Sequence, residues 1–197
     1  MRLQSDHADL YPEDYQGFEQ GPIRPPSEAY SLLIRVTRNC PWNFCTFCPI
    51  YKETRFSLRP VDHVKQDIDM LHKYVEMLRN IADESGRVSR NEMNNVLENT
   101  DYRERPALQA AIHWFSGGMR SIFIQDANSL IIKPADLVEI LKHLMKRFHW
   151  VERITSYARS HTIARIKAKD LQTIRNAGLN RIHIGLESGS DQVLKMA

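Results

Sequence analysis

The chain has 197 residues, of which 42% are hydrophobic and 26% are charged, and its formal net charge is +3. This length and composition favour one domain with a sizeable core and exclude an intrinsically disordered chain. No apolar run is long enough to span a membrane and the first residues lack a signal-peptide stretch, so we expect a cytoplasmic protein with no membrane partner.

The first half of the chain combines an arm, a strand and a long helix. Residues 1–29 are polar and contain four prolines, which predicts an extended N-terminal arm. The apolar run 30–37 predicts a buried strand. Pro60 begins a helix whose apolar side chains recur at helical spacing, namely Val61, Val64, Ile68, Leu71, Val75 and Leu78. Residues 80–116 break this rhythm and predict a charged, partly helical insertion.

The second half alternates between strands and helices. Strands are predicted over 121–126, 153–158 and 181–187, and helices over 133–148, 168–179 and 190–197. This order predicts an α/β fold with a parallel sheet, built either as an open doubly wound sheet or as a (β/α) barrel. In both architectures ligands bind at the C-terminal ends of the strands, so the loops after the four predicted strands should meet at one edge.

The last predicted strand has two different faces. Along 181–187, side chains should alternate between the two faces of the strand. We expect His183, Gly185 and Glu187 to face the ligand side. We expect Ile182, Ile184 and Leu186 to pack under helices. A carboxylate at the end of an otherwise apolar strand is costly without a partner. This favours a functional role for Glu187.

Positive charge gathers in the second half. Residues 142–181 carry ten Lys and Arg side chains against two acidic ones. They predict either solvated helix faces or a surface that attracts an anionic ligand. Because no aromatic side chains are interleaved with these charges in a recognition pattern, support for nucleic acid as a partner is weak.

All three cysteines fall within NCPWNFCTFCPI, residues 39–50, directly after the first predicted strand. An odd number argues against a disulfide framework, and a structural zinc site would need a fourth ligand from a distant histidine. A redox Cys-x-x-Cys motif formed by Cys45 and Cys48 would leave Cys40 unexplained. A [4Fe–4S] cluster held by only three thiolates has one open iron, which can bind a substrate or cofactor.

With this cysteine stretch after the first strand of a strand–helix series, the chain resembles the radical S-adenosylmethionine (SAM) enzymes over residues 30–197. The segment GLESGSDQVLK resembles the coproporphyrinogen-dehydrogenase-like, methylthiotransferase-like and elongator-like members. The resemblance implies a partial (β/α) barrel. The family core has six strand–helix units and four strands are found here, so we expect the C-terminal part of the barrel to be missing and the chain to be poorly active or inactive alone.

The resemblance also implies residue roles. The cluster ligands are Cys40, Cys45 and Cys48, spaced C-x4-C-x2-C where the family's common spacing is C-x3-C-x2-C. The expected SAM-binding residues are Phe47 near the adenine, Gln125, Asp126 and Ala127 in place of a Gly-Gly-Glu-like turn, Glu187, and Tyr157 and Arg159 after the third strand. An arginine there suits the methionyl carboxylate.

The implied activity is reductive cleavage of SAM to a 5′-deoxyadenosyl radical that abstracts hydrogen from an unassigned substrate. The implied partner is an electron donor such as flavodoxin or ferredoxin. Methylthiotransferase chemistry is disfavoured, since no further cysteines are present to hold a second cluster. An alternative from another class stays open, namely a non-catalytic iron–sulfur or zinc module that binds a partner and has no affinity for SAM.

Overall fold

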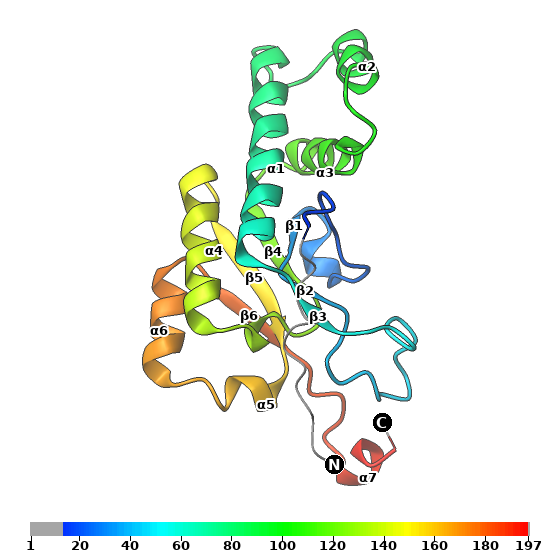
Figure 1. Ribbon diagram of the computed structural model, residues 1–197, viewed down its shortest axis with the longest axis vertical. Helices are drawn as coiled ribbons and strands as arrows, with labels where there is room; N and C mark the ends of the chain where they lie inside the picture. Colours follow the sequence, from blue (N-terminus) through cyan, green and yellow to red (C-terminus); the bar gives the residue numbers. More distant parts are fainter. Residues whose placement is uncertain (1–13, 197) are drawn as a thin grey trace.

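The computed structural model describes residues 14–196, so residues 1–13 of the expected N-terminal arm and residue 197 lie outside the described part. Its centre is a parallel sheet in the order β1-β4-β5-β6, formed by Leu32–Arg35, Ser121–Gln125, Arg153–Ala158 and Arg181–Ile184 (Figure 1). The strand order follows the chain without reversal. This confirms the α/β fold with a four-stranded parallel sheet, and within residues 14–196 the sheet stays open.

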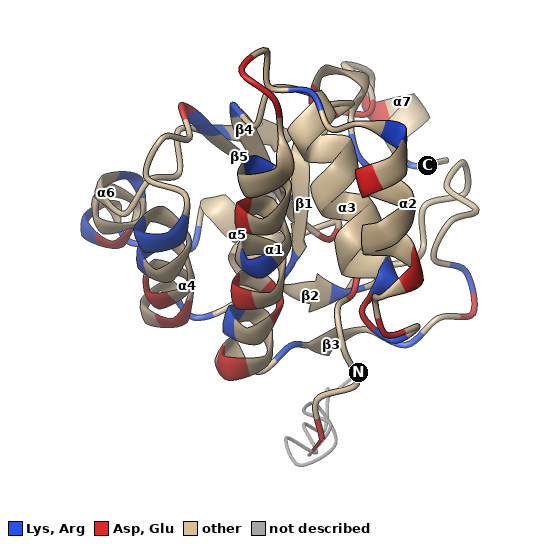
Figure 2. Ribbon diagram, turned by 90° about the horizontal axis from the view of Figure 1, so that it is seen from above, with Lys and Arg blue, Asp and Glu red and all other residues tan. Residues whose placement is uncertain are grey.

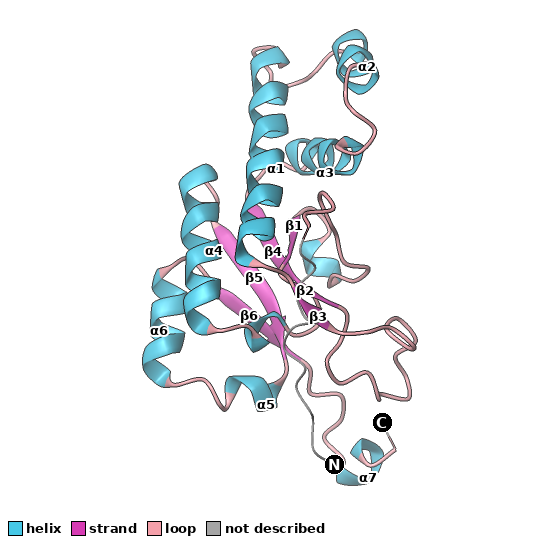
Figure 3. Ribbon diagram, viewed as in Figure 1, coloured by secondary structure: helices cyan, strands magenta, loops and turns pink. Residues whose placement is uncertain are grey.

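Helices flank the sheet (Figure 3). The main ones are α1 (Val61–Ile81), α3 (Arg105–Ser116), α4 (Pro134–Arg147) and α6 (Ala168–Asn176). They pack as neighbours in the order α3, α1, α4, α6 along one side of the sheet (Figure 2). Shorter helices lie in the connections: α2 (Arg90–Glu98), α5 (Ser160–Ile163), α7 (Asp191–Leu194) and the 3-10 turns η2 (Pro26–Glu28) and η3 (Ser129–Ile131).

The core lies between these helices and one face of the sheet. The predicted stripe on α1 is confirmed, because Val64, Ile68, Leu71, Val75 and Leu78 are all buried and Val61 packs against the same cluster. Alternate residues of β1 and β4 meet this stripe, namely Leu32 and Ile34, and Ile122 and Ile124. Period-two alternation in the strands and helical spacing in α1 thus direct their apolar side chains into one shared core.

The expected insertion 80–116 divides into two different parts. Its first part includes α2, which has no buried residue. Its second part, α3, belongs to the core, because Ala107, Leu108, Ala111 and Trp114 are fully buried. The apolar face of α3 was not predicted, because the charged residues before it dominate the sequence pattern of the stretch 80–116. The crossover from β1 to β4 therefore contains two core helices, α1 and α3.

Half of the basic residues in 142–181 lie on α4 and α6, and the others lie in strands and connecting segments. Lys142 and Lys146 on α4 and Lys169 and Arg175 on α6 are exposed. Figure 2 shows Lys and Arg positions in blue on both helices. For the residues on α4 and α6, this arrangement matches solvated helix faces, the simpler of the two predictions. Within the part of the chain that the structure describes, no helix has the length and apolarity needed to cross a membrane.

Glu28, the last residue of η2, is a buried acid that contacts residues of the sheet strands. Its Oε2 accepts a hydrogen bond from Ser31 Oγ at 2.5 Å and lies 3.3 Å from Arg153 Nη2, while its Oε1 lies 3.6 Å from His183 Nε2. Burial acts to raise the pKa of the Glu28 carboxyl. The Ser31 hydrogen bond and the charge of Arg153 outweigh burial, so this pKa lies below its usual value.

Glu28→Gln is therefore expected to destabilise the fold near neutral pH and much less in acid. A lowered folded-state pKa means that the stabilisation is fully present above the unfolded-state pKa of about 4.3, and is lost as the pH falls through the folded-state value. Urea unfolding of both proteins at about pH 7 and about pH 3.5 measures this. An equal difference in the free energy of unfolding at both pH values would contradict it.

Candidate functional site

The cysteine loop (residues 39–51) leaves the sheet region after β2 (Thr37–Arg38) and returns toward β3 (Ser57–Leu58). These two short strands pair antiparallel, which holds the two flanks of the loop side by side. Asn39 and Asn43 have φ angles of 65° and 50°, a left-handed conformation that asparagine tolerates well. The side-chain amide of Asn43 donates to the carbonyl oxygen of Tyr51, so the loop folds back on itself.

The cysteines themselves are half-buried free thiols. Among residues 14–196, no group of three His, Cys, Asp or Glu side chains is arranged to hold a metal ion. The donor chemistry of three thiols on one loop fits an iron–sulfur cluster. Holding one would require the loop to draw the three sulfur atoms together.

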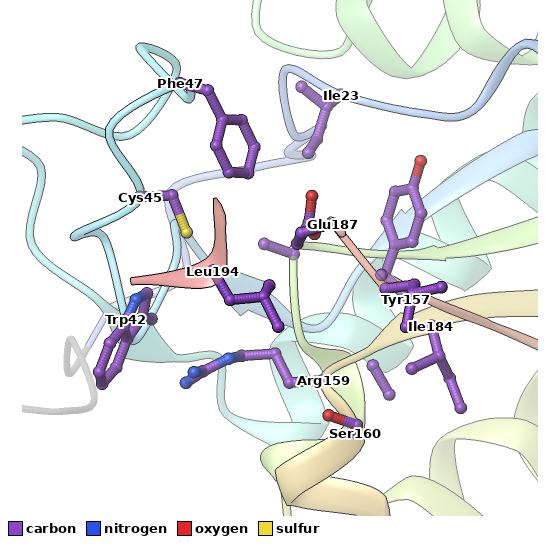
Figure 4. A pocket seen from close by; sticks show the side chains of 14 residues that line it. Ile23, Trp42, Cys45, Phe47, Tyr157, Arg159, Ser160, Ile184, Glu187 and Leu194 are labelled. Carbon is purple, nitrogen blue, oxygen red and sulfur yellow. The ribbon is translucent and has the colours of Figure 1, made fainter. Parts of the chain in front are cut away.

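A pocket of about 740 Å³ lies beside this loop, at the C-terminal ends of the strands. Its volume is within the range of about 300–1,000 Å³ that is usual for small-molecule sites. Its walls come from the cysteine loop, from the turns after β4, β5 and β6, and from α7 (Figure 4). The predicted convergence of these loops on one edge of the sheet is confirmed.

The pocket gathers six of the predicted site residues: Cys45, Phe47, Ala127, Tyr157, Arg159 and Glu187. Figure 4 shows Cys45 and Phe47 on the loop side and Tyr157 and Arg159 across from them. Cys40, Cys48, Gln125 and Asp126 are not among the residues that line it. The loop thus contributes one thiol and one aromatic ring directly to the pocket wall.

Arg159 is the positive charge of the pocket. Its backbone N–H donates to the side chain of Asn128 at 3.0 Å, which joins the turn after β5 to the turn after β4. Its guanidinium lies over the ring of Trp42, 4.5 Å from the ring centre, a distance typical of a cation–π contact. Trp42 lies between Cys40 and Cys45, so this contact links the cysteine loop to the sheet.

Gln125 and Asp126 are buried and occupied by protein contacts. The Gln125 side chain accepts from Gly21 N at 2.8 Å and donates to Ile23 O at 2.6 Å, which fastens the N-terminal segment across the strand ends. The Asp126 carboxylate is bound by groups of β1 and of the cysteine loop. Of the three residues expected in place of the Gly-Gly-Glu-like turn, Ala127 alone lines the pocket.

The segment after β6 departs from the expected alternation. The strand ends at Ile184, and the prediction that Ile184 and Leu186 pack under helices is wrong, because they are 48% and 77% exposed and line the pocket. Period-two alternation requires extended backbone, whereas Glu187 has a φ of 59°. The carboxyl group of Glu187 is exposed and folds over Gly185, where a side-chain carbon would collide with Glu187 Oε1.

Sequence reasoning missed several residues of the site. These are Ile23, Trp42, Ser160 and Leu194 in the pocket wall, and Asn128 beneath it. Trp42 and Asn128 could have been predicted as site residues, since both lie in segments that the sequence already places at the strand ends. Ile23 had no such signal, because it comes from the N-terminal segment, far in sequence from the other pocket residues. Leu194 is close to Glu187 in sequence, but it lies on α7 and not in one of the loops expected at the strand ends.

The fold and site define an α/β protein with a ligand-sized pocket at the C-terminal edge of a parallel sheet, adjoining a loop with three free thiols. The pocket combines apolar walls with one positive and one negative side chain, Arg159 and Glu187. No family model matches the chain, and no curated protein or solved structure matches it either.

Proposed function

We propose that this chain is a radical SAM enzyme core that binds a [4Fe–4S] cluster through Cys40, Cys45 and Cys48. One observation carries the proposal: three free thiols lie on one loop beside a pocket that is built from the ends of successive parallel strands. When bound, the cluster supplies the electron that cleaves SAM to the radical that abstracts hydrogen from substrate. The four-stranded sheet is then part of a (β/α) barrel.

The pocket residues suit the parts of SAM. Arg159 offers a guanidinium to the methionyl carboxylate, and Glu187 offers a carboxylate that can accept a hydrogen bond from the amino group while both groups of SAM bind the open iron. Phe47 presents a ring on the pocket wall that suits stacking on adenine. Ile184 and Leu186 provide apolar surface. Tyr157 is a further SAM-binding candidate on the same wall.

The remaining partners follow from the same proposal. An electron donor such as flavodoxin or ferredoxin would have to approach the cluster closely. The exposed side chains Phe44, Phe47 and Ile50 on the cysteine loop leave that approach open. A cytoplasmic location suits reduced thiols. The substrate stays unassigned.

Anaerobic reconstitution with iron and sulfide tests the proposal. The expected product is a brown protein with about four irons and four sulfides per chain, as a cubane cluster requires. One zinc per chain and no colour would contradict it and support the alternative, a non-catalytic metal module that binds a partner.

A further inference from the structure

The carboxylate of Asp126 ties the two ends of the cysteine loop to the sheet. Its Oδ2 accepts from Arg35 Nη2 at 2.9 Å and from the backbone N–H of Asn39 at 3.2 Å. Its Oδ1 accepts from the hydroxyl of Tyr51. Asn39 and Tyr51 are the first and last residues of the cysteine loop, so one buried side chain at the end of β4 holds both.

The surroundings of this carboxylate exclude water and fix its position. The side chain of Asp126 is fully buried, and Tyr51 is 2% exposed. Burial and the hydrogen bond to Asp126 raise the pKa of Tyr51, so its hydroxyl stays protonated and donates. Gly21 closes the other side, where a side-chain carbon would lie 2.9 Å from Asp126 Oδ2.

The cysteine loop is thus held firmly at its ends and exposed in between. Phe44, Phe47 and Ile50 are all exposed. A loop with fixed ends has less conformational freedom to lose when it closes around a ligand. To gather the thiols the interior would have to rearrange, while the ends keep the loop beside the pocket.

We propose that Asp126 is a positioning residue for the cluster: by binding Asn39 and Tyr51 it holds the cysteine loop in the place where the three thiolates receive the iron. This rests on the proposed function. The role differs from direct contact with SAM, because the carboxylate is taken up by protein donors.

A second buried aspartate provides a matched control. Asp67 on α1 accepts from the Tyr15 hydroxyl at 2.7 Å, from Arg59 and from the backbone N–H of Glu19 at 3.5 Å. It therefore has the same donor types as Asp126, namely a tyrosine, an arginine and a backbone N–H, and none of its donors is in the cysteine loop. Matched substitutions at the two sites separate a loss of stability from a loss of loop position.

The test compares Tyr51→Phe with Tyr15→Phe, each of which removes one hydroxyl and keeps the ring. The reconstituted proteins are challenged with an iron chelator, and cluster loss is followed by the visible absorbance. Tyr51→Phe is expected to lose the cluster at least several-fold faster than wild type, and Tyr15→Phe at the wild-type rate. Asp126→Asn is expected to lose the cluster faster still, and Asp67→Asn to lose it at the wild-type rate. Iron per folded chain should be at least halved in Asp126→Asn and unchanged in Asp67→Asn.

Equal rates of cluster loss in wild type, Tyr51→Phe and Tyr15→Phe would overturn the positioning role and leave the proposed function intact. Equal acceleration in both variants, in proportion to their lowered unfolding temperatures, would also overturn it, because the effect would then be one of stability. A wild-type chain that takes up no cluster would overturn both proposals.

Discussion

Replacing any one of Cys40, Cys45 and Cys48 with alanine is expected to abolish stable binding of a [4Fe–4S] cluster. Each of three irons depends on one thiolate, and the chain has no further cysteine to substitute for a missing ligand. Iron and sulfide counts after anaerobic reconstitution and gel filtration should fall from about four per chain to near zero. The loss should be the same for all three positions, including those that do not line the pocket.

Thr46→Ala is the matched control on the same loop. Thr46 lies next to Cys45, is exposed and carries no thiol; its hydroxyl donates to the carbonyl oxygen of Met196 at 2.9 Å. This variant should retain the cluster in full. A cysteine variant that keeps about four irons would remove that cysteine from the ligand set.

Trp114→Ala is expected to lower the free energy of unfolding by about 3–5 kcal/mol, the usual cost of truncating a large buried aromatic. Trp114 on α3 is 0% exposed, its ring meets Phe148 edge-on with centroids 5.0 Å apart, and its indole N–H donates to Ser121 O at 2.8 Å. The substitution leaves a cavity and removes one hydrogen bond to the Ser121 carbonyl at the start of β4. Urea denaturation measures the change.

Trp42→Ala is the matched control, because it removes a tryptophan side chain from the surface and not from the core. Trp42 is 46% exposed, so its truncation should change the free energy of unfolding by under about 1 kcal/mol. A similar loss in both variants, or a loss under about 1 kcal/mol for Trp114→Ala, would contradict the placement of α3 in the core.

Regular elements could be predicted because their patterns are local. The strand predicted over 153–158 is found as Arg153–Ala158, and the helix opened by Pro60 is found as Val61–Ile81. In the helix a period of 3.6 repeats for long enough to decide the element, and the run 153–158 carries the strand formers Ile154, Thr155 and Tyr157. The period-two prediction failed after Ile184, because the strand ends there and side chains alternate between two faces only along extended backbone.

The partners of Asp126 could not be predicted, since they lie 75 to 91 positions away in sequence. From the sequence alone Asp126 is a polar turn residue, equally suited to binding a ligand or to holding the chain. Tyr51 likewise follows the cysteines without any signal of its burial. Only the parallel pairing of β1 with β4 brings the cysteine loop and the end of β4 together.

The central claim is that three thiolates leave one iron open to SAM. The most direct test is the electron paramagnetic resonance spectrum of the reconstituted, reduced protein with and without SAM. The account predicts that SAM changes the g-values of the reduced cluster, because its amino and carboxylate groups would bind the open iron. A full four-iron cluster whose spectrum is unchanged at saturating SAM would contradict the claim.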